Sequence, residues 1–191
     1  MILTFMNLNQ ILNSMAYRTR TYIAGDWTGD KDAIDQLYKW NRSNYWSLDF
    51  IDAHELTQSS DTSLYCSIKA SLRERLDRSK TFVLIVGEST SSLTKGNCVY
   101  CRNYIPSYSG GPKCSHGYGI SMKSYIDYEC DKAIRDGLNI VVLYNSTYVK
   151  KDLCPVSIRD VGEHAPMKTW KNGALEWDYQ SVKSAFDKAT K

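Results

Sequence analysis

Several patterns that would assign a function directly are absent from this sequence of 191 residues. Lysine and arginine form no dense run and the net charge is only +3, so the composition indicates neither nucleic acid nor a charged membrane surface as a partner. No Walker or dinucleotide-type glycine pattern follows the first expected strand, and no serine nucleophile elbow is present. Phosphate-loop and serine-hydrolase chemistry therefore have no support in the sequence.

Long hydrophobic runs are also missing. The first fourteen residues are partly apolar, but asparagine and glutamine interrupt them and no positive charge precedes them, unlike a signal peptide; they are also too short to span a bilayer. We therefore expect a cytoplasmic protein without a membrane segment, consisting of an N-terminal extension over 1–16 and one domain over 17–191. In that setting the six cysteines are expected to be thiols or metal ligands rather than disulfides.

What the sequence does contain is a regular alternation of strand and helix patterns. The expected strands are 20–25, 48–52, 81–87, 138–144 and a short edge strand at 167–170, with a helix after each of them. The runs 81–87 and 138–144 are apolar without interruption, which is typical of strands covered on both faces. We predict an α/β fold, a flavodoxin-like three-layer sandwich around a mainly parallel five-stranded sheet, with ligands at the carboxyl ends of the strands.

The helix before the last long strand carries the most informative residue. Ser124 followed by Asp127 forms a capping box, and Gly137 lets the helix end in a left-handed turn. Helical arithmetic places Glu129 roughly 80° from the centre of the apolar stripe, at the edge of the core, where a carboxylate is half desolvated and still reaches a ligand. The alternative is an ordinary surface acid, favoured by the helix dipole and by a pair with Lys132.

The same helical period predicts where other charged side chains point. In helix 64–76 it places Lys69 and Arg75 largely on the outside, and it turns Lys132 away from the core. Asp30 is in position to cap the helix that follows the first strand. The three basic side chains, Lys69, Arg75 and Lys132, are therefore expected to be solvated.

A glycine-rich insert at about 94–120 concentrates cysteine and histidine. Cys98 and Cys101 have the spacing of a metal-binding knuckle, and Cys114 with His116 completes a Cys₃His set that suits a structural zinc ion. Four protein ligands leave no position open for water, so a catalytic role is not indicated. The alternative is a loop whose thiols are merely packed.

Five short motifs, in this order and spacing over about residues 17–150, resemble those of the TIR-like family, and in particular the bacterial TIR-like proteins of Thoeris anti-phage systems. They are Tyr22-Ile23-Ala24-Gly25-Asp26, Ile68-Lys69-x-x-Leu72, Phe82-Val83-Leu84-Ile85-Val86-Gly87-x-x-Thr90, Tyr125-x-x-x-Glu129-x-x-x-Ala133 and Asn139-Ile140-Val141-Val142. Two departures are the Cys/His insert, where most relatives have a short connection, and Tyr125 in place of the usual tryptophan.

The resemblance implies an activity on NAD. In catalytic members an aromatic residue stands four positions before a glutamate that handles the ribose while nicotinamide leaves, and Tyr125 and Glu129 match these positions. Thoeris members cyclise the resulting ADP-ribose into a diffusible signal that activates a separate effector protein. A phage-derived trigger and self-assembly are further partners that the family implies.

The nucleotide is expected at the carboxyl ends of the first and third strands. By analogy with the family, Asp26 and Trp27 after the first strand and Ser89 and Thr90 after the third are candidate substrate-binding residues. Turn and capping roles explain these four residues equally well. The resemblance adds Tyr125, before Glu129, as a fifth candidate substrate-binding residue.

Two other functions stay open on the sequence. The first is an N-glycosidase similar to the nucleoside deoxyribosyltransferases, whose first strand resembles Tyr22-Ile23-Ala24-Gly25. The second is a non-enzymatic interaction module that uses the TIR-like fold only for assembly. An enzyme is expected to place Glu129 in a pocket with Asp26, Trp27 and Thr90, whereas an interaction module has no reason to keep one.

Overall fold

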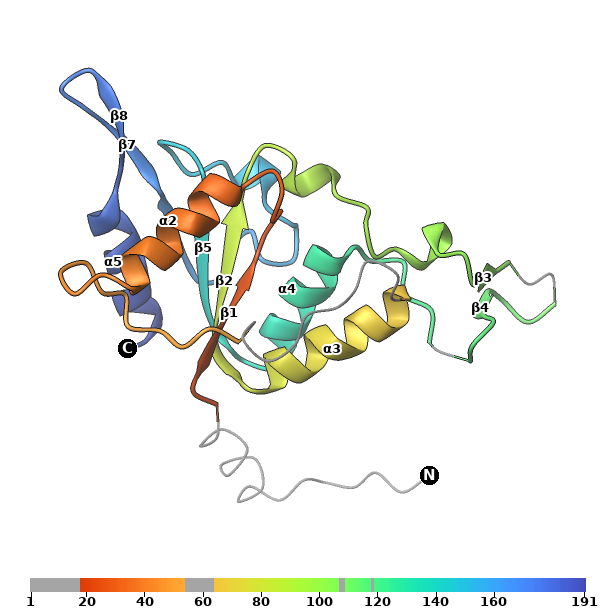
Figure 1. Ribbon diagram of the computed structural model, residues 1–191. Coiled ribbons are helices and arrows are strands. Elements are labelled where there is room, and N and C mark those ends of the chain that lie inside the picture. The colour runs from red at the N-terminus through yellow and green to blue at the C-terminus, as the bar shows by residue number, and fades with distance from the viewer. Residues whose placement is uncertain (1–17, 54–63, 107–108, 118) are drawn as a thin grey trace.

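The computed structural model describes residues 18–53, 64–106, 109–117 and 119–191, and a parallel four-stranded sheet forms its centre (Figure 1). The sheet consists of β1 (Arg20–Ala24), β2 (Ser79–Val86), β5 (Asn139–Tyr144) and β6 (Glu163–Pro166), hydrogen-bonded in that order. Each neighbouring pair of strands is parallel. The predicted α/β architecture is confirmed.

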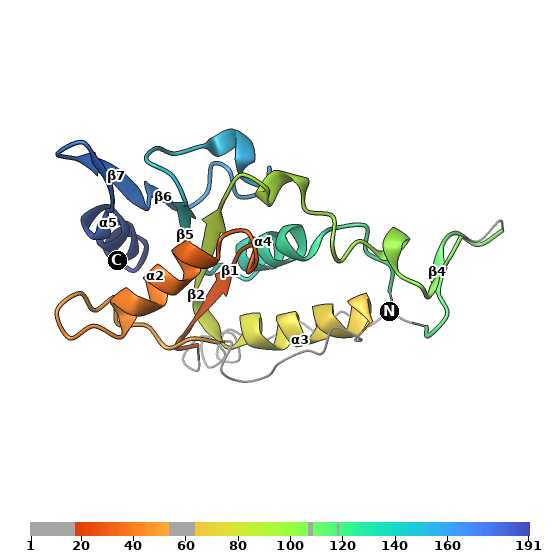
Figure 2. The ribbon, with the colours of Figure 1, turned by 45° about the horizontal axis from the view of Figure 1, so that its top comes forward.

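Four helices cover the sheet on both faces. They are α2 (Lys31–Asn41), α3 (Tyr65–Asp77), α4 (Tyr125–Arg135) and α5 (Tyr179–Ala189). Figure 2 shows α2 and α5 on one side of the sheet and α3 and α4 on the other, side by side. The shorter elements are η2 (Thr90–Ser92), η3 (Cys98–Tyr100), β3 (Tyr104–Ile105), β4 (Lys113–Cys114), η4 (Lys151–Leu153), β7 (Lys168–Lys171) and β8 (Ala174–Trp177).

The apolar runs serve two separate cores because side chains alternate along a strand. Tyr22, Phe82 and Leu84 belong to the cluster beneath α3 and α4. Their neighbours Ile23 and Val83 belong to the cluster beneath α2 and α5. Both faces of each central strand are buried, which explains why the runs show no polar interruption.

The predicted strand over 48–52 is not formed, so the sheet has four strands rather than five. The segment pairs with β1 through one parallel bridge, between Thr21 and Asp52. The Asn41 side chain satisfies both backbone hydrogen-bonding groups of Phe50. It accepts from the Phe50 N–H at 2.9 Å and donates to the Phe50 carbonyl at 2.9 Å. The bridge nevertheless lies on the outer side of β1, the position that a flavodoxin-like order gives to the second strand.

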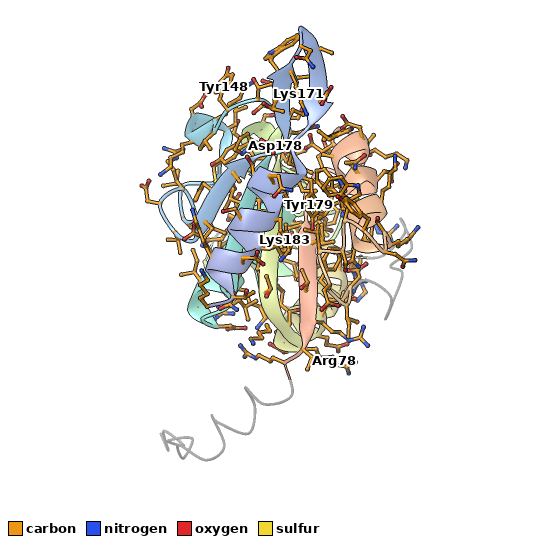
Figure 3. All side chains as sticks on the ribbon, turned by 90° about the vertical axis from the view of Figure 1, so that its left-hand side faces the viewer. Arg78, Tyr148, Lys171, Asp178, Tyr179 and Lys183 are labelled. Atoms are coloured by element: carbon orange, nitrogen blue, oxygen red, sulfur yellow. The ribbon has the colours of Figure 1, made fainter. Side chains whose placement is uncertain are left out.

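The predicted edge strand over 167–170 belongs to a separate hairpin. β7 pairs with β8 antiparallel, and the edge of the main sheet is β6 instead. Asn172 and Gly173 both have positive φ, at 53° and 77°, as a two-residue hairpin turn requires. Figure 3 shows this hairpin, with Lys171, extending beyond the start of α5 at Asp178 and Tyr179.

Three cations predicted to be solvated are buried. Lys69 and Arg75 on α3 are each 6% exposed, and Lys132 on α4 is 4% exposed. The helices α3 and α4 lie against each other, so side chains on the facing sides of the two helices are buried even where they point away from the sheet. Lys132 Nζ is paired there with Asp77 at 2.6 Å and with Asp136 at 2.5 Å.

Candidate functional site

The helix that carries Glu129 forms as its sequence predicts. Ser124 accepts a hydrogen bond from the backbone N–H of Asp127 at 3.1 Å, which satisfies one of the free donors of the first turn. Gly137 has φ of +65° directly after the helix, a conformation that glycine adopts without strain. The α4 helix is thus fixed at both ends around Glu129.

Glu129 is more deeply buried than the helical arithmetic indicates. Its exposed fraction is 6%, and Tyr22 donates a hydrogen bond from its hydroxyl to Glu129 Oε1 at 2.6 Å. Tyr22 lies in the middle of β1, fully buried, and its ring stacks on Phe82 with centroids 6.0 Å apart. The carboxyl group is therefore held between the first strand of the sheet and α4.

Burial dominates the electrostatics of this pair. It raises the pKa of Glu129 from 4.5 to about 7, although the hydrogen bond from Tyr22 and the positive charge of Arg75 oppose the shift. Burial and then the charge of Glu129 raise the pKa of Tyr22 well above its ordinary value, so Tyr22 stays a protonated donor. Near neutral pH the Glu129 carboxyl can therefore exist in either protonation state, as acid–base and electrostatic catalysis require.

Four of the five candidate substrate-binding residues follow β1 and β2, where the sequence places them. Trp27 is 46% exposed and lies against Tyr38, with ring centroids 6.4 Å apart. Asp26 accepts a hydrogen bond from the backbone N–H of Thr28 at 3.1 Å. Ser89 is exposed. Within the described residues, Glu129 is hydrogen-bonded to Tyr22 rather than to any of these four side chains.

Thr90 acts in a turn. It is buried, and its hydroxyl accepts a hydrogen bond from the backbone N–H of Gly87 at 2.9 Å. This contact closes the turn that leads from β2 into η2. The structure thus supports a turn-forming role for Thr90, and its predicted contact with substrate stays a prediction.

A second polar cluster at the carboxyl ends of the strands was not predicted. Asp30 makes no side-chain cap bond; it accepts instead from Asn145 Nδ2 at 3.0 Å, just after β5. Asp30 is 3% exposed and its burial raises the pKa of its carboxyl. A Cβ atom at Gly87 would lie 1.9 Å from Asp30 Oδ1, so a larger residue there would displace the Asp30 carboxyl. The sequence signal for this cluster is Asn145, a polar residue directly after a buried strand.

Tyr125 begins α4 next to the insert. Its backbone N–H donates to the Lys95 carbonyl at 2.9 Å, and its ring meets Tyr65 edge-on with centroids 5.7 Å apart. A Cβ atom at Gly96 would lie 2.5 Å from the Tyr125 ring. The aromatic residue one turn before Glu129 therefore contacts the insert and α3.

The insert brings Cys98, Cys101 and Cys114 together around one small cavity. Cys66 of α3 also lines it, whereas His116 is exposed and does not. All six cysteines are free thiols. As the described residues stand, no three histidine, cysteine or acidic side chains are already arranged to hold a metal ion. In the described ranges, no helix has both the length and the apolar character needed to cross a bilayer.

Residues 17–95 match the family model described as the TIR-like domain of the Thoeris protein ThsB. A search among curated proteins finds no match. The matched range contains Tyr22 and Arg75, and it ends at the start of the insert, before Glu129.

Proposed function

Residues 17–95 place the chain in the TIR-like family of the Thoeris anti-phage proteins, and on this premise we propose that it is an enzyme that cleaves the nicotinamide–ribose bond of NAD. It joins the ends of the resulting ADP-ribose into a cyclic signal for a separate effector protein. The observation that carries this proposal is the buried Glu129 carboxyl, hydrogen-bonded to Tyr22, with its pKa raised to about 7.

The chemistry suits a single carboxylate. When the bond between the ribose C1′ and the pyridinium nitrogen breaks, its electron pair goes to the nitrogen and nicotinamide leaves neutral, so no general acid is needed. The sugar becomes oxocarbenium-like, and the ionised Glu129 stabilises that positive charge from within a low-dielectric site. Tyr22 and Arg75 favour this ionised form.

The second half of the reaction needs a proton acceptor. A nucleophilic atom of the same ADP-ribose attacks C1′ and gives a cyclic product, or water attacks and gives linear ADP-ribose; either nucleophile loses one proton. A carboxylate with a pKa near 7 is matched to accept it at neutral pH. Glu129 therefore serves both steps.

The low exposure of Glu129 bears on regulation. At 6% exposure the carboxyl is covered, so NAD reaches it only after the cover is displaced. This agrees with an enzyme that turns over after a phage-derived trigger or after assembly. It equally favours a second candidate, a non-enzymatic interaction module in which Glu129 and Tyr22 simply join α4 to β1.

Product analysis separates these two candidates. We expect the chain, incubated with NAD at high protein concentration, to release nicotinamide together with a nucleotide that mass spectrometry shows to be one water lighter than ADP-ribose. Linear ADP-ribose as the only product would support glycohydrolase activity and contradict cyclase activity. Intact NAD, both in the concentrated protein and in lysate of phage-infected cells that express it, would support the interaction module.

A further inference from the structure

Four cysteine side chains from three separate segments line one cavity. They are Cys66 in the first turn of α3, Cys98 and Cys101 at η3, and Cys114 of β4. The cavity volume is about 10 Å³, the space of roughly one small atom or ion. Figure 1 shows the insert with β3 and β4 extending from the N-terminal end of α3. Four of the eight residues that line this cavity are thus sulfur donors.

The backbone around the thiols is shaped as in a metal-binding knuckle. The N–H of Cys101 donates to the carbonyl of Cys98 at 3.0 Å, which closes the turn between them. The N–H of Ser121 donates to Cys98 Sγ at 3.3 Å, a contact that favours a thiolate. Cys114 starts a second turn, in which its carbonyl accepts from the N–H of Gly117 at 3.0 Å.

A buried cation lies beside the cluster. Lys69, one turn after Cys66 on α3, is 6% exposed, and its ammonium group donates to Ser121 Oγ at 3.0 Å and to the Lys123 carbonyl at 2.7 Å. Four thiolates around a divalent ion carry a net charge of −2. A buried ammonium group offsets part of that charge and lowers the free energy needed to bury it.

The Tyr125 hydroxyl supplies an unused hydrogen-bond donor at the same place. It is buried and has no hydrogen-bond partner among the described residues. The Tyr125 ring meets the ring of Tyr65, the residue before Cys66, edge-on with centroids 5.7 Å apart, so Tyr125 packs against the end of α3 that carries Cys66. A metal-bound thiolate is a strong acceptor for such a donor.

We propose that Cys66, Cys98, Cys101 and Cys114 bind one structural zinc ion. Four sulfur ligands in tetrahedral geometry suit zinc and leave no position for a catalytic water. Zinc–sulfur bonds are about 2.3 Å long, and because the thiols of the described residues are not yet arranged around an ion, binding requires their side chains to rotate toward the cavity. Cys66 takes the position that the sequence assigns to His116. The ion fastens the insert to the N-terminal ends of α3 and α4, one turn from Glu129.

Metal analysis of the full chain, purified without chelators, tests the site. We expect about one zinc per chain, retention of zinc by the matched control His116→Asn, and its loss from Cys66→Ser. Zinc kept by Cys66→Ser but lost from His116→Asn would overturn the ligand set. Absence of zinc, iron in its place, or fewer than six thiols after denaturation would overturn the zinc site itself.

Cobalt substitution keeps the test decisive if Cys66→Ser does not fold. The parent chain, refolded with Co²⁺ after chelation, is expected to show the visible bands of a tetrahedral ion with four thiolates. Titration with zinc is expected to abolish these bands at one equivalent. Bands of a three-thiolate site with one nitrogen ligand, or of six-coordinate Co²⁺, would contradict the assignment.

Discussion

Glu129→Gln is expected to reduce the release of nicotinamide from NAD at least about 100-fold, the loss typical of removing one aligned electrostatic group from a buried site. Glutamine has nearly the same shape and can still accept the 2.6 Å hydrogen bond from Tyr22. It cannot carry the negative charge that stabilises the oxocarbenium-like sugar. Chromatography of the reaction mixture measures the released nicotinamide.

The matched control for this experiment is Glu176→Gln. Glu176 lies exposed on β8, in the hairpin outside the main sheet, so the same chemical change is made far from α4. We expect this variant to release nicotinamide at the parent rate. Equal nicotinamide release by the parent and Glu129→Gln, with both variants folded, would show that Glu129 takes no part in the reaction.

Glu129→Gln is also expected to change how stability depends on pH. In the folded chain the Glu129 carboxyl has a pKa of about 7, raised from 4.5, so the folded state binds its proton more tightly than the unfolded state does. The resulting contribution to stability is complete below about pH 4.5 and is lost as the pH rises through 7. Glutamine mimics the protonated carboxyl, so the variant keeps that contribution at every pH.

The size of this effect follows from the shift. The difference between a pKa of about 7 in the folded chain and the ordinary value of 4.5 corresponds to about 3 kcal/mol in the free energy of unfolding. Urea unfolding from pH 4 to pH 9 is therefore expected to show similar free energies of unfolding for the two proteins in acid, and Glu129→Gln as the more stable protein above pH 8. A difference that stays constant across this range would show that the Glu129 carboxyl is not desolvated in the folded chain.

Local patterns predicted most of the framework. The uninterrupted apolar runs gave the two central strands, and the capping residues Ser124 and Gly137 gave the bounds of α4, because each depends on neighbours in the chain. The hairpin turn also had a local signal, because Asn172-Gly173 is a typical two-residue turn sequence. The predicted single edge strand at 167–170 did not take this signal into account. The segment 48–52 had strand composition, but a side chain from α2 took its hydrogen bonds.

The contacts that complete the two sites could not be read from local spacing. Tyr22 reaches Glu129 across 107 residues of sequence, so no motif joins them. Cys66 is in a helix, separated from the insert in sequence, and only the packing of the insert against the end of α3 brings its thiol to the other three. The burial of Lys69 and Lys132 likewise depends on the pairing of α3 with α4.

The pH dependence of nicotinamide release by the parent and by Tyr22→Phe tests most directly whether the buried pair performs the reaction. If ionised Glu129 is the active form, the parent rate at low NAD concentration rises through an inflection near pH 7. Phenylalanine removes a hydrogen bond that lowers the Glu129 pKa, so the inflection is predicted to move to higher pH. The same inflection in both proteins would contradict the assignment of Glu129 as the group whose ionisation controls the rate and of Tyr22 as the residue that favours its ionised form.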